Sequence, residues 1–152
     1  MTEAERLEAI LNREGFTCVV SKNGRILTSY DRGIRPVLQW IENDIDAVRG
    51  AVVCDKVVGK AAALLFVYGG IGEILAGVVS VPALEVFKAH GIVCVYRKLV
   101  SRIQNRDQTG LCPMEERAID LTEPEEAYTL FSQIVKKTES KRQEESECSI
   151  GD

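Results

Sequence analysis

The first part of the chain carries the hydrophobic spacing of a short helix followed by a β-hairpin. Leu7, Ile10 and Leu11 recur at helical spacing, and a glycine follows them as a helix stop. Two β-rich runs come next and flank the dipeptide Asn23-Gly24, which tolerates the positive φ angles of a tight turn. We therefore predict an N-terminal helix and then two antiparallel strands, at residues 16–21 and 25–30.

The middle of the chain alternates between continuously apolar runs and stretches with helical spacing. Such apolar runs are typical of strands that are covered on both faces. Strands are predicted at residues 50–54, 74–79 and 92–96, and helices at 34–41, 59–68 and 80–90. This order requires parallel pairing with right-handed crossovers, and the hairpin adds antiparallel strands. The predicted fold class is α/β, a three-layer domain with a mixed sheet and helices on both faces.

Beyond residue 100 the pattern becomes more polar. Residues 101–111 are irregular, and Pro113 followed by acidic residues predicts a short helix. Residues 122–135 then carry an amphipathic stripe behind a capping box. The chain that follows is charged and has no apolar periodicity, which is typical of a solvated tail. We predict one domain over residues 1–136 and a disordered charged tail over residues 137–152.

Composition limits the classes of function. The 152 residues are 45% hydrophobic, which is enough to bury a single core. A net charge of -4, with acidic and basic residues mixed along the chain, argues against binding of extended nucleic acid. The most apolar segment, residues 59–71, is too short to cross a membrane, and the acidic N-terminus does not resemble a signal peptide. Five scattered cysteines without a CxxC pair fit a reducing compartment, so we expect a cytoplasmic protein.

Three separate segments of the chain are similar to a known protein family. They cover residues 55–63, 82–86 and 105–115, and the likeness extends from about Cys18 to Tyr128. The segments resemble the bacterial family known as domain of unknown function 1893. This resemblance implies a cytidine-deaminase-like fold, and it implies no established activity.

The resemblance also places two helix starts where deaminases of this fold hold a catalytic zinc ion. Such enzymes use a His or Cys at the first helix start, two Cys at the next, and a Glu that transfers protons. By order of elements these positions fall on residues 59–62 and 82–86, where a lysine and aliphatic residues replace the ligands. Zinc needs thiolate or imidazole donors, so we expect no catalytic zinc and no cofactor. The alternative is that Cys54, Cys94 and Cys112 converge into a relocated metal site.

Cys112 is the best candidate for covalent or redox catalysis. It comes just before Pro113 at a predicted helix start, where the helix dipole favours a thiolate. The acidic residues Glu115 and Glu116 oppose this effect one turn later. The alternative is a structural role, in which Cys112 caps the helix or packs beneath the loop.

Asp55 and Lys60 are the main candidates for ligand binding. They bracket a predicted junction between a strand and a helix, the usual position of ligands in open α/β sheets. Lys60 could hold a phosphate or carboxylate together with backbone N–H groups, or the two residues could form a structural pair in which Asp55 caps the helix. Arg102 begins a polar loop that could also grip an anion. The predicted ligand-binding set is completed by Asn105, Thr109, Gly110 and Glu115.

These residues support one leading hypothesis and two alternatives. We expect a deaminase-fold protein that lacks the zinc site and binds a small anionic or nucleotide-like ligand. One alternative is an enzyme that depends on Cys112. The other is an interaction protein without catalysis that acts through a homo-oligomer interface.

Overall fold

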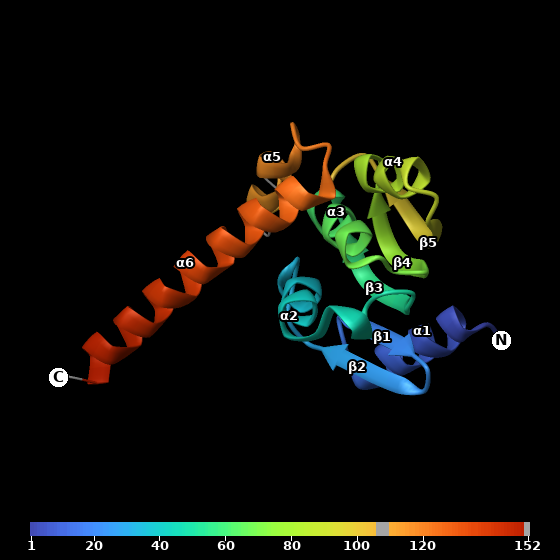
Figure 1. Cartoon of the computed structure of the whole chain (residues 1–152), viewed down its shortest axis with the longest axis horizontal. Helices are drawn as coiled ribbons and strands as arrows, with labels where there is room; N and C mark the ends of the chain where they lie inside the picture. Colours follow the sequence, from blue (N-terminus) through green and yellow to red (C-terminus); the bar gives the residue numbers. More distant parts are fainter. Residues whose placement is uncertain (106–109, 151–152) are drawn as a thin grey trace.

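The chain folds around a five-stranded mixed sheet with helices on both faces, as the computed structural model in Figure 1 shows. The structure describes residues 1–105 and 110–150, with side chains described as far as residue 138. The strand order is β2-β1-β3-β4-β5. The strands are β1 (Cys18–Lys22), β2 (Arg25–Ser29), β3 (Val52–Val58), β4 (Glu73–Ser80) and β5 (Val93–Val100). The predicted mixed α/β sheet is confirmed.

Pairing within the sheet divides it into an antiparallel part and a parallel part. β1 pairs antiparallel with both β2 and β3, whereas β3, β4 and β5 are parallel. Asn23 and Gly24 join the hairpin with φ angles of 50° and 82°, the conformation that the predicted tight turn requires. Parallel strands end at the same edge of the sheet, so the segments that follow β3, β4 and β5 begin side by side.

The helices cover the two faces of the sheet unequally. Helix α1 (Glu3–Glu14) packs on one face, where Leu7 and Leu11 meet Val19, Cys54 and Leu75 of the sheet. The opposite face carries the larger core and the helices that build it. These are α2 (Arg35–Asp44), the short 3-10 helix η1 (Ile45–Ala47), α3 (Lys60–Gly69), α4 (Val81–Ala89), α5 (Pro113–Ala118) and α6 (Pro124–Ile150).

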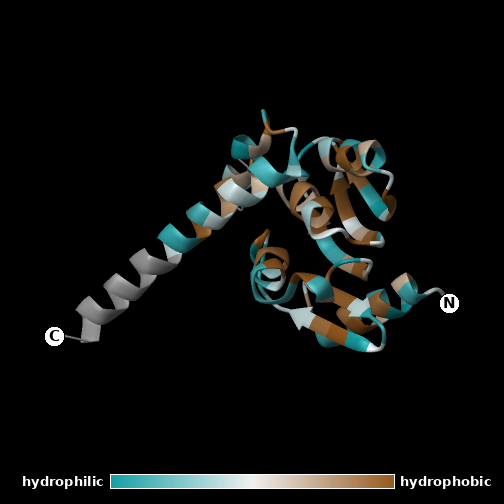
Figure 2. Ribbon diagram, viewed as in Figure 1, coloured by the Kyte–Doolittle hydropathy of each residue, from teal (hydrophilic) through white to brown (hydrophobic). Residues whose placement is uncertain are grey.

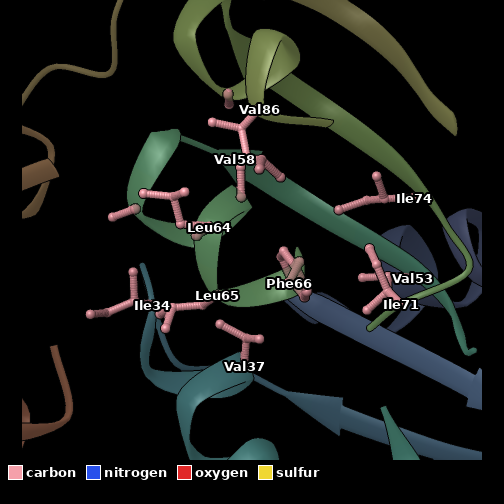
Figure 3. Packing of buried hydrophobic residues seen from close by; sticks show 14 of the residues in the cluster. Ile34, Val37, Val53, Val58, Leu64, Leu65, Phe66, Ile71, Ile74 and Val86 are labelled. Atoms are coloured by element: carbon pink, nitrogen blue, oxygen red, sulfur yellow. The ribbon is translucent and has the colours of Figure 1, made fainter. Parts of the chain in front are cut away.

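Helix α3 lies at the centre of the larger core and carries no polar side chain between Ala61 and Phe66. All residues from Ala61 to Phe66 are buried, and Leu64, Leu65 and Phe66 pack in one cluster with the sheet, α2 and α4 (Figure 3). Its three consecutive alanines let neighbouring elements approach closely, and α3 packs against α4, α5 and α6. Because α3 is enclosed, its first backbone N–H groups need partners from the protein itself.

Hydrophobic residues follow the strands and α3 in the hydropathy view of Figure 2. The edge strand β5 differs from the inner strands because several of its apolar side chains are exposed, among them Val93 and Val95. Val95 pairs with Leu75 of β4, which α1 covers, so the cover of α1 ends one strand before the edge. Within the described residues, no helix is long and apolar enough to cross a lipid bilayer.

The first half of α6 anchors the C-terminal part of the chain to the larger core. Tyr128 stacks on Tyr68 of α3 with ring centroids 4.5 Å apart and planes 6° from parallel, and Ala127 and Phe131 are buried. The helix continues to Ile150, well past residue 136, where the sequence predicts the end of the domain. The Lys, Glu, Gln and Arg residues of this stretch have high helix propensity.

We expect the buried ring of Phe131 to contribute strongly to the docking of α6. Phe131→Ala should lower the free energy of unfolding by roughly 3–5 kcal/mol, because it removes a fully buried aromatic side chain and leaves a cavity. Urea denaturation followed by circular dichroism measures this loss. Gln133→Ala, an exposed change on the same helix, is the control and should have little effect.

Candidate functional site

A cavity of about 280 Å³ lies at the edge of the sheet where the parallel strands end. Helices α3 and α4 begin directly after β3 and β4, and Arg102 follows β5 by two residues. In open α/β sheets this edge is the usual position of ligands. The described residues that line the cavity are Lys60, Ser80, Pro82, Glu85, Arg102, Ile103, Leu111, Glu115 and Ile119.

Glu115 closes the beginning of α3 although it lies 55 residues further along the chain than Lys60. Its carboxylate accepts hydrogen bonds from the backbone N–H of Lys60 at 2.8 Å and of Ala61 at 3.2 Å. The residue at the N-cap of α3 is Gly59, which has no side chain for this purpose. A carboxylate suits the position because the N-terminus of a helix carries unpaired N–H groups and partial positive charge.

Lys60 makes the reverse contact, from α3 back to α5. Its Nζ donates a hydrogen bond to the backbone oxygen of Ile119 at 2.9 Å, and Ile119 is the C-cap residue of α5. Each helix therefore supplies one charged side chain to the backbone at the end of the other. Lys60 and Glu115 both line the cavity, so these two contacts form part of its wall.

The absence of a side chain at Gly59 leaves room for the carboxylate of Glu115 beside it. A Cβ atom at this position would lie 2.0 Å from Oε1 of Glu115. The φ angle of Gly59 is -99° and its ψ angle is -178°, an extended conformation that any residue can adopt. The requirement is therefore steric, and it comes from the packing of α5 on α3.

The cavity combines two cationic side chains, Lys60 and Arg102, with two acidic ones, Glu85 and Glu115. Burial raises the pKa of Glu115, and the amide donors of α3 and the positive charge of Lys60 act in the opposite direction. Glu85 and Arg102 are exposed at the rim, whereas Lys60 and Glu115 are half-buried. Such a wall can offer hydrogen bonds and positive charge to a small polar ligand.

The beginning of α4 completes the cavity with neutral groups. The hydroxyl of Ser80 accepts a hydrogen bond from the N–H of Ala83 at 3.2 Å, and Pro82 occupies the first turn. These residues and Lys60 occupy the two helix starts that the resemblance to deaminases assigns to zinc ligands. An ammonium, a hydroxyl and a proline ring do not fit a zinc ion that needs thiolates and imidazole. In the described part of the chain, no three His, Cys, Asp or Glu side chains form a group suited to a metal ion.

Asp55 lies elsewhere, inside the sheet. Strand β3 continues through Val58 instead of ending at residue 54 as predicted, because the β-branched Val57 and Val58 extend it. Asp55 is therefore a buried strand residue opposite Cys18 of β1, and it does not cap α3. Burial raises its pKa to about 8, although hydrogen bonds from the backbone N–H groups of Val57 and Lys56 and from Cys18 favour the charged form. The structure therefore contradicts the alternative in which Asp55 caps the helix and pairs with Lys60. Glu115 caps α3 instead.

The cysteines do not converge on one position. Cys54 packs beneath α1, whereas Cys94 packs against the core on the opposite face of the sheet. Burial raises the pKa of Cys54 to about 12 and that of Cys94 to about 11, so both are neutral thiols at neutral pH. Cys112 is the half-buried N-cap residue of α5, and its side chain makes no capping hydrogen bond. It is not among the residues that line the cavity.

Of the described residues that were predicted to bind a ligand in the polar loop and the helix after it, only Arg102 and Glu115 line the cavity. The N–H of Asn105 donates to the oxygen of Gly110 at 2.9 Å, and the N–H of Cys112 donates to Ile103 at 3.0 Å. These bonds form a narrow arm that leads from β5 to α5. Asn105 and Gly110 do not line the cavity, and Thr109 lies outside the described residues. Glu85 was missed by the sequence analysis, although its position one turn into α4 is a signal that could have indicated it.

The fold and the cavity define a class of mixed α/β domains with a small cavity at the ends of the parallel strands, lined by apolar and charged side chains. The model of one family, Domain of unknown function (DUF1893), matches residues 6–135, and the chain belongs to this family. A DUF1893 family protein from Thermotoga maritima, known from a crystal structure, is similar at a TM-score of 0.78 and 26% identity, over 88% of this chain and 92% of that one. A comparison with curated proteins gives no match. The recognition of the family from three sequence segments is therefore confirmed.

The buried carboxyl of Asp55 should make stability depend on pH. Its pKa is about 8 in the folded chain against 3.8 as the reference value, so between these values the unfolded chain loses a proton that the folded chain keeps. The contribution of Asp55 to stability is then greatest below about pH 4 and falls by up to about 1.4 kcal/mol per pH unit until about pH 8. Asp55→Asn cannot ionise and should be increasingly more stable than the wild type across this window. Thermal unfolding at pH 5 and pH 8 tests this, and an equal difference at both values would contradict it.

A double-mutant cycle tests the steric relation between Gly59 and Glu115. Gly59→Ala should lower the free energy of unfolding by about 1–3 kcal/mol, because it expels Glu115 from the amides of α3. Glu115→Ala should have a similar effect for the same reason. Once Glu115 is absent, Gly59→Ala should have almost no effect, since the backbone is already extended. Additive losses, measured by urea denaturation, would show that the two positions are independent.

Proposed function

We propose that this protein is a binding module for a small anionic ligand, and that the cavity between α3, α4 and α5 is its binding site. The observation that carries the proposal is the position of Lys60 and Arg102 in the wall of one cavity at the ends of the parallel strands. The two residues come from separate elements and bring two positive charges to the same small volume. Cations in this arrangement favour phosphate or carboxylate groups.

The size of the cavity limits the ligand. Its volume of about 280 Å³ is near the lower end of the range that small-molecule sites have, roughly 300–1,000 Å³. A phosphorylated sugar or a small carboxylate fits this volume, and a nucleotide requires a larger opening. The acidic residues Glu85 and Glu115 suit a ligand that also carries hydroxyl or amine donors.

The likeness to deaminases that we propose concerns the fold and not the chemistry. The order of helices after β3 and β4 supports a deaminase-like architecture, while the residues at the two helix starts suit an anion better than a zinc ion. Catalysis by Cys112 stays a prediction, and no contact of its thiol with the cavity favours it. Self-association and a cytoplasmic location likewise stay predictions.

Thermal shift with a set of small anions tests the binding site. Inorganic phosphate, ribose 5-phosphate, nucleoside monophosphates and small dicarboxylates are the compounds to compare. A compound present at one hundred times its Kd should stabilise the chain by about 2.7 kcal/mol. Arg102→Ala should weaken binding at least about tenfold, since it removes one of the two cations.

Lys60→Ala should also weaken binding, and it additionally removes the hydrogen bond to Ile119. Lys88→Ala removes a cation from the far end of α4 and is the matched control, which should bind like the wild type. Absence of stabilisation by every compound would contradict the proposal, as would stabilisation that both Arg102→Ala and Lys60→Ala leave unchanged.

A further inference from the structure

We infer that the ligand of the cavity is a small zwitterion, whose anionic group binds Lys60 and Arg102 and whose ammonium group pairs with the carboxylate of Glu85. This inference names the class of ligand for the proposed binding site and rests on that proposal. An amino acid and an aminoalkyl phosphate both have this chemistry, because each carries an anion and an ammonium on a short carbon skeleton.

The charged side chains that line the cavity are balanced in number. Lys60 and Arg102 contribute positive charges, and Glu85 and Glu115 contribute negative ones. A ligand that carries negative charge alone is attracted by the first pair and repelled by the second. A ligand that also carries a positive charge turns the contribution of an acidic residue into attraction. The wall therefore favours a ligand with charges of both signs.

Glu85 is the acidic residue that is available to such a ligand. Both carboxylate oxygens of Glu115 already accept hydrogen bonds, from the amides of Lys60 and Ala61. In the described part of the chain, neither Glu85 nor Arg102 takes part in an ion pair or a side-chain hydrogen bond. These two side chains of opposite charge line one cavity without pairing with each other, so each can pair with a group of the ligand.

Lys60 keeps donors for the anionic group although it contacts α5. Its Nζ donates one hydrogen bond to the oxygen of Ile119, and an ammonium group has three donors. Arg102 adds a guanidinium group, which can bind a carboxylate or a phosphate through two parallel hydrogen bonds. Lys60 begins α3, Arg102 follows β5, and Glu85 lies one turn into α4. A ligand therefore needs its opposite charges on separate groups to meet side chains from three different elements.

The apolar residues of the wall favour a ligand with a short carbon skeleton between its charges. Pro82, Ile103, Leu111 and Ile119 line the same cavity of about 280 Å³. Apolar side chains offer no hydrogen bonds, so a ligand covered with hydroxyl groups loses bonds with water when it contacts them. Methylene groups lose no hydrogen bonds in this position and gain from burial. The wall thus suits an amino acid or an aminoalkyl phosphate better than a sugar.

Matched pairs of compounds test the role of the ammonium group. Phosphoethanolamine and hydroxyethyl phosphate have the same skeleton and differ in an ammonium or a hydroxyl group, and so do aspartate and malate. Isothermal titration calorimetry at low ionic strength measures the dissociation constant of each compound. In at least one pair, the ammonium compound should bind about fivefold more tightly than its hydroxyl partner, since one ion pair in contact with water contributes about this factor.

Glu85→Gln keeps the size of the side chain and removes its charge. It should abolish the preference for the ammonium compound and leave the hydroxyl compound bound at least as tightly as before. Glu116→Gln removes the same charge from an exposed residue of α5 that does not line the cavity, so it is the matched control and should keep the preference. A purely structural role of Glu85 in α4 predicts instead that both compounds of a pair change alike.

The same compounds separate failure of this inference from failure of the proposed function. Equal binding of both members of each pair, weakened alike by Arg102→Ala, would support the anion site and overturn the zwitterion. A preference that Glu85→Gln leaves unchanged would overturn it as well. If none of these compounds binds, the zwitterion is also overturned, and stabilisation by inorganic phosphate or another anion then shows whether the anion site itself stands.

Discussion

The carboxylate of Glu115 lies on the first amides of α3, and the geometry of the cavity depends on this contact. A Cβ atom at position 59 would lie 2.0 Å from Oε1 of Glu115 and would displace this carboxylate, and Lys60 in turn donates to the backbone oxygen of Ile119. A helix whose first turns are buried must have its N–H groups paired, and here the partner comes from a distant part of the chain. The same contact therefore satisfies the backbone and forms a wall of the proposed site.

Burial within the sheet determines the ionisation of Asp55. Asp55 and Cys18 lie opposite each other on neighbouring strands, and burial disfavours the charged form of both. Burial therefore favours the neutral form of the Asp55 carboxyl, which lies in the sheet as a hydrogen-bonding group. Burial also raises the pKa of Glu115, but the amide donors of α3 and the positive charge of Lys60 act in the opposite direction. Two carboxyl groups of one domain thus have separate roles, one in the core and one in the cavity wall.

The family relation and the cavity together describe a mixed α/β domain with charged and hydroxyl groups at the helix starts beside its cavity. The chain matches its family over residues 6–135 and shares its fold with the Thermotoga maritima protein. At the ends of the parallel strands, Lys60, Ser80 and Arg102 line the cavity. In the proposed function these groups recognise an anion, and Lys60 also contacts the end of α5.

Much of the fold followed from the sequence because local spacing reports which face of an element is buried. The Asn23-Gly24 hairpin, the enclosed helix α3 and the helix start at Ser80 were all predictable from neighbouring residues. The sequence predicted both Lys60 and Glu115 as site residues. It did not predict the contact between them, because the two residues are far apart in the chain. Tertiary structure alone decided that Asp55 is buried opposite Cys18 and that Glu115 caps α3. The physical reason is that burial and long-range capping depend on which elements pack together, and local periodicity does not specify this.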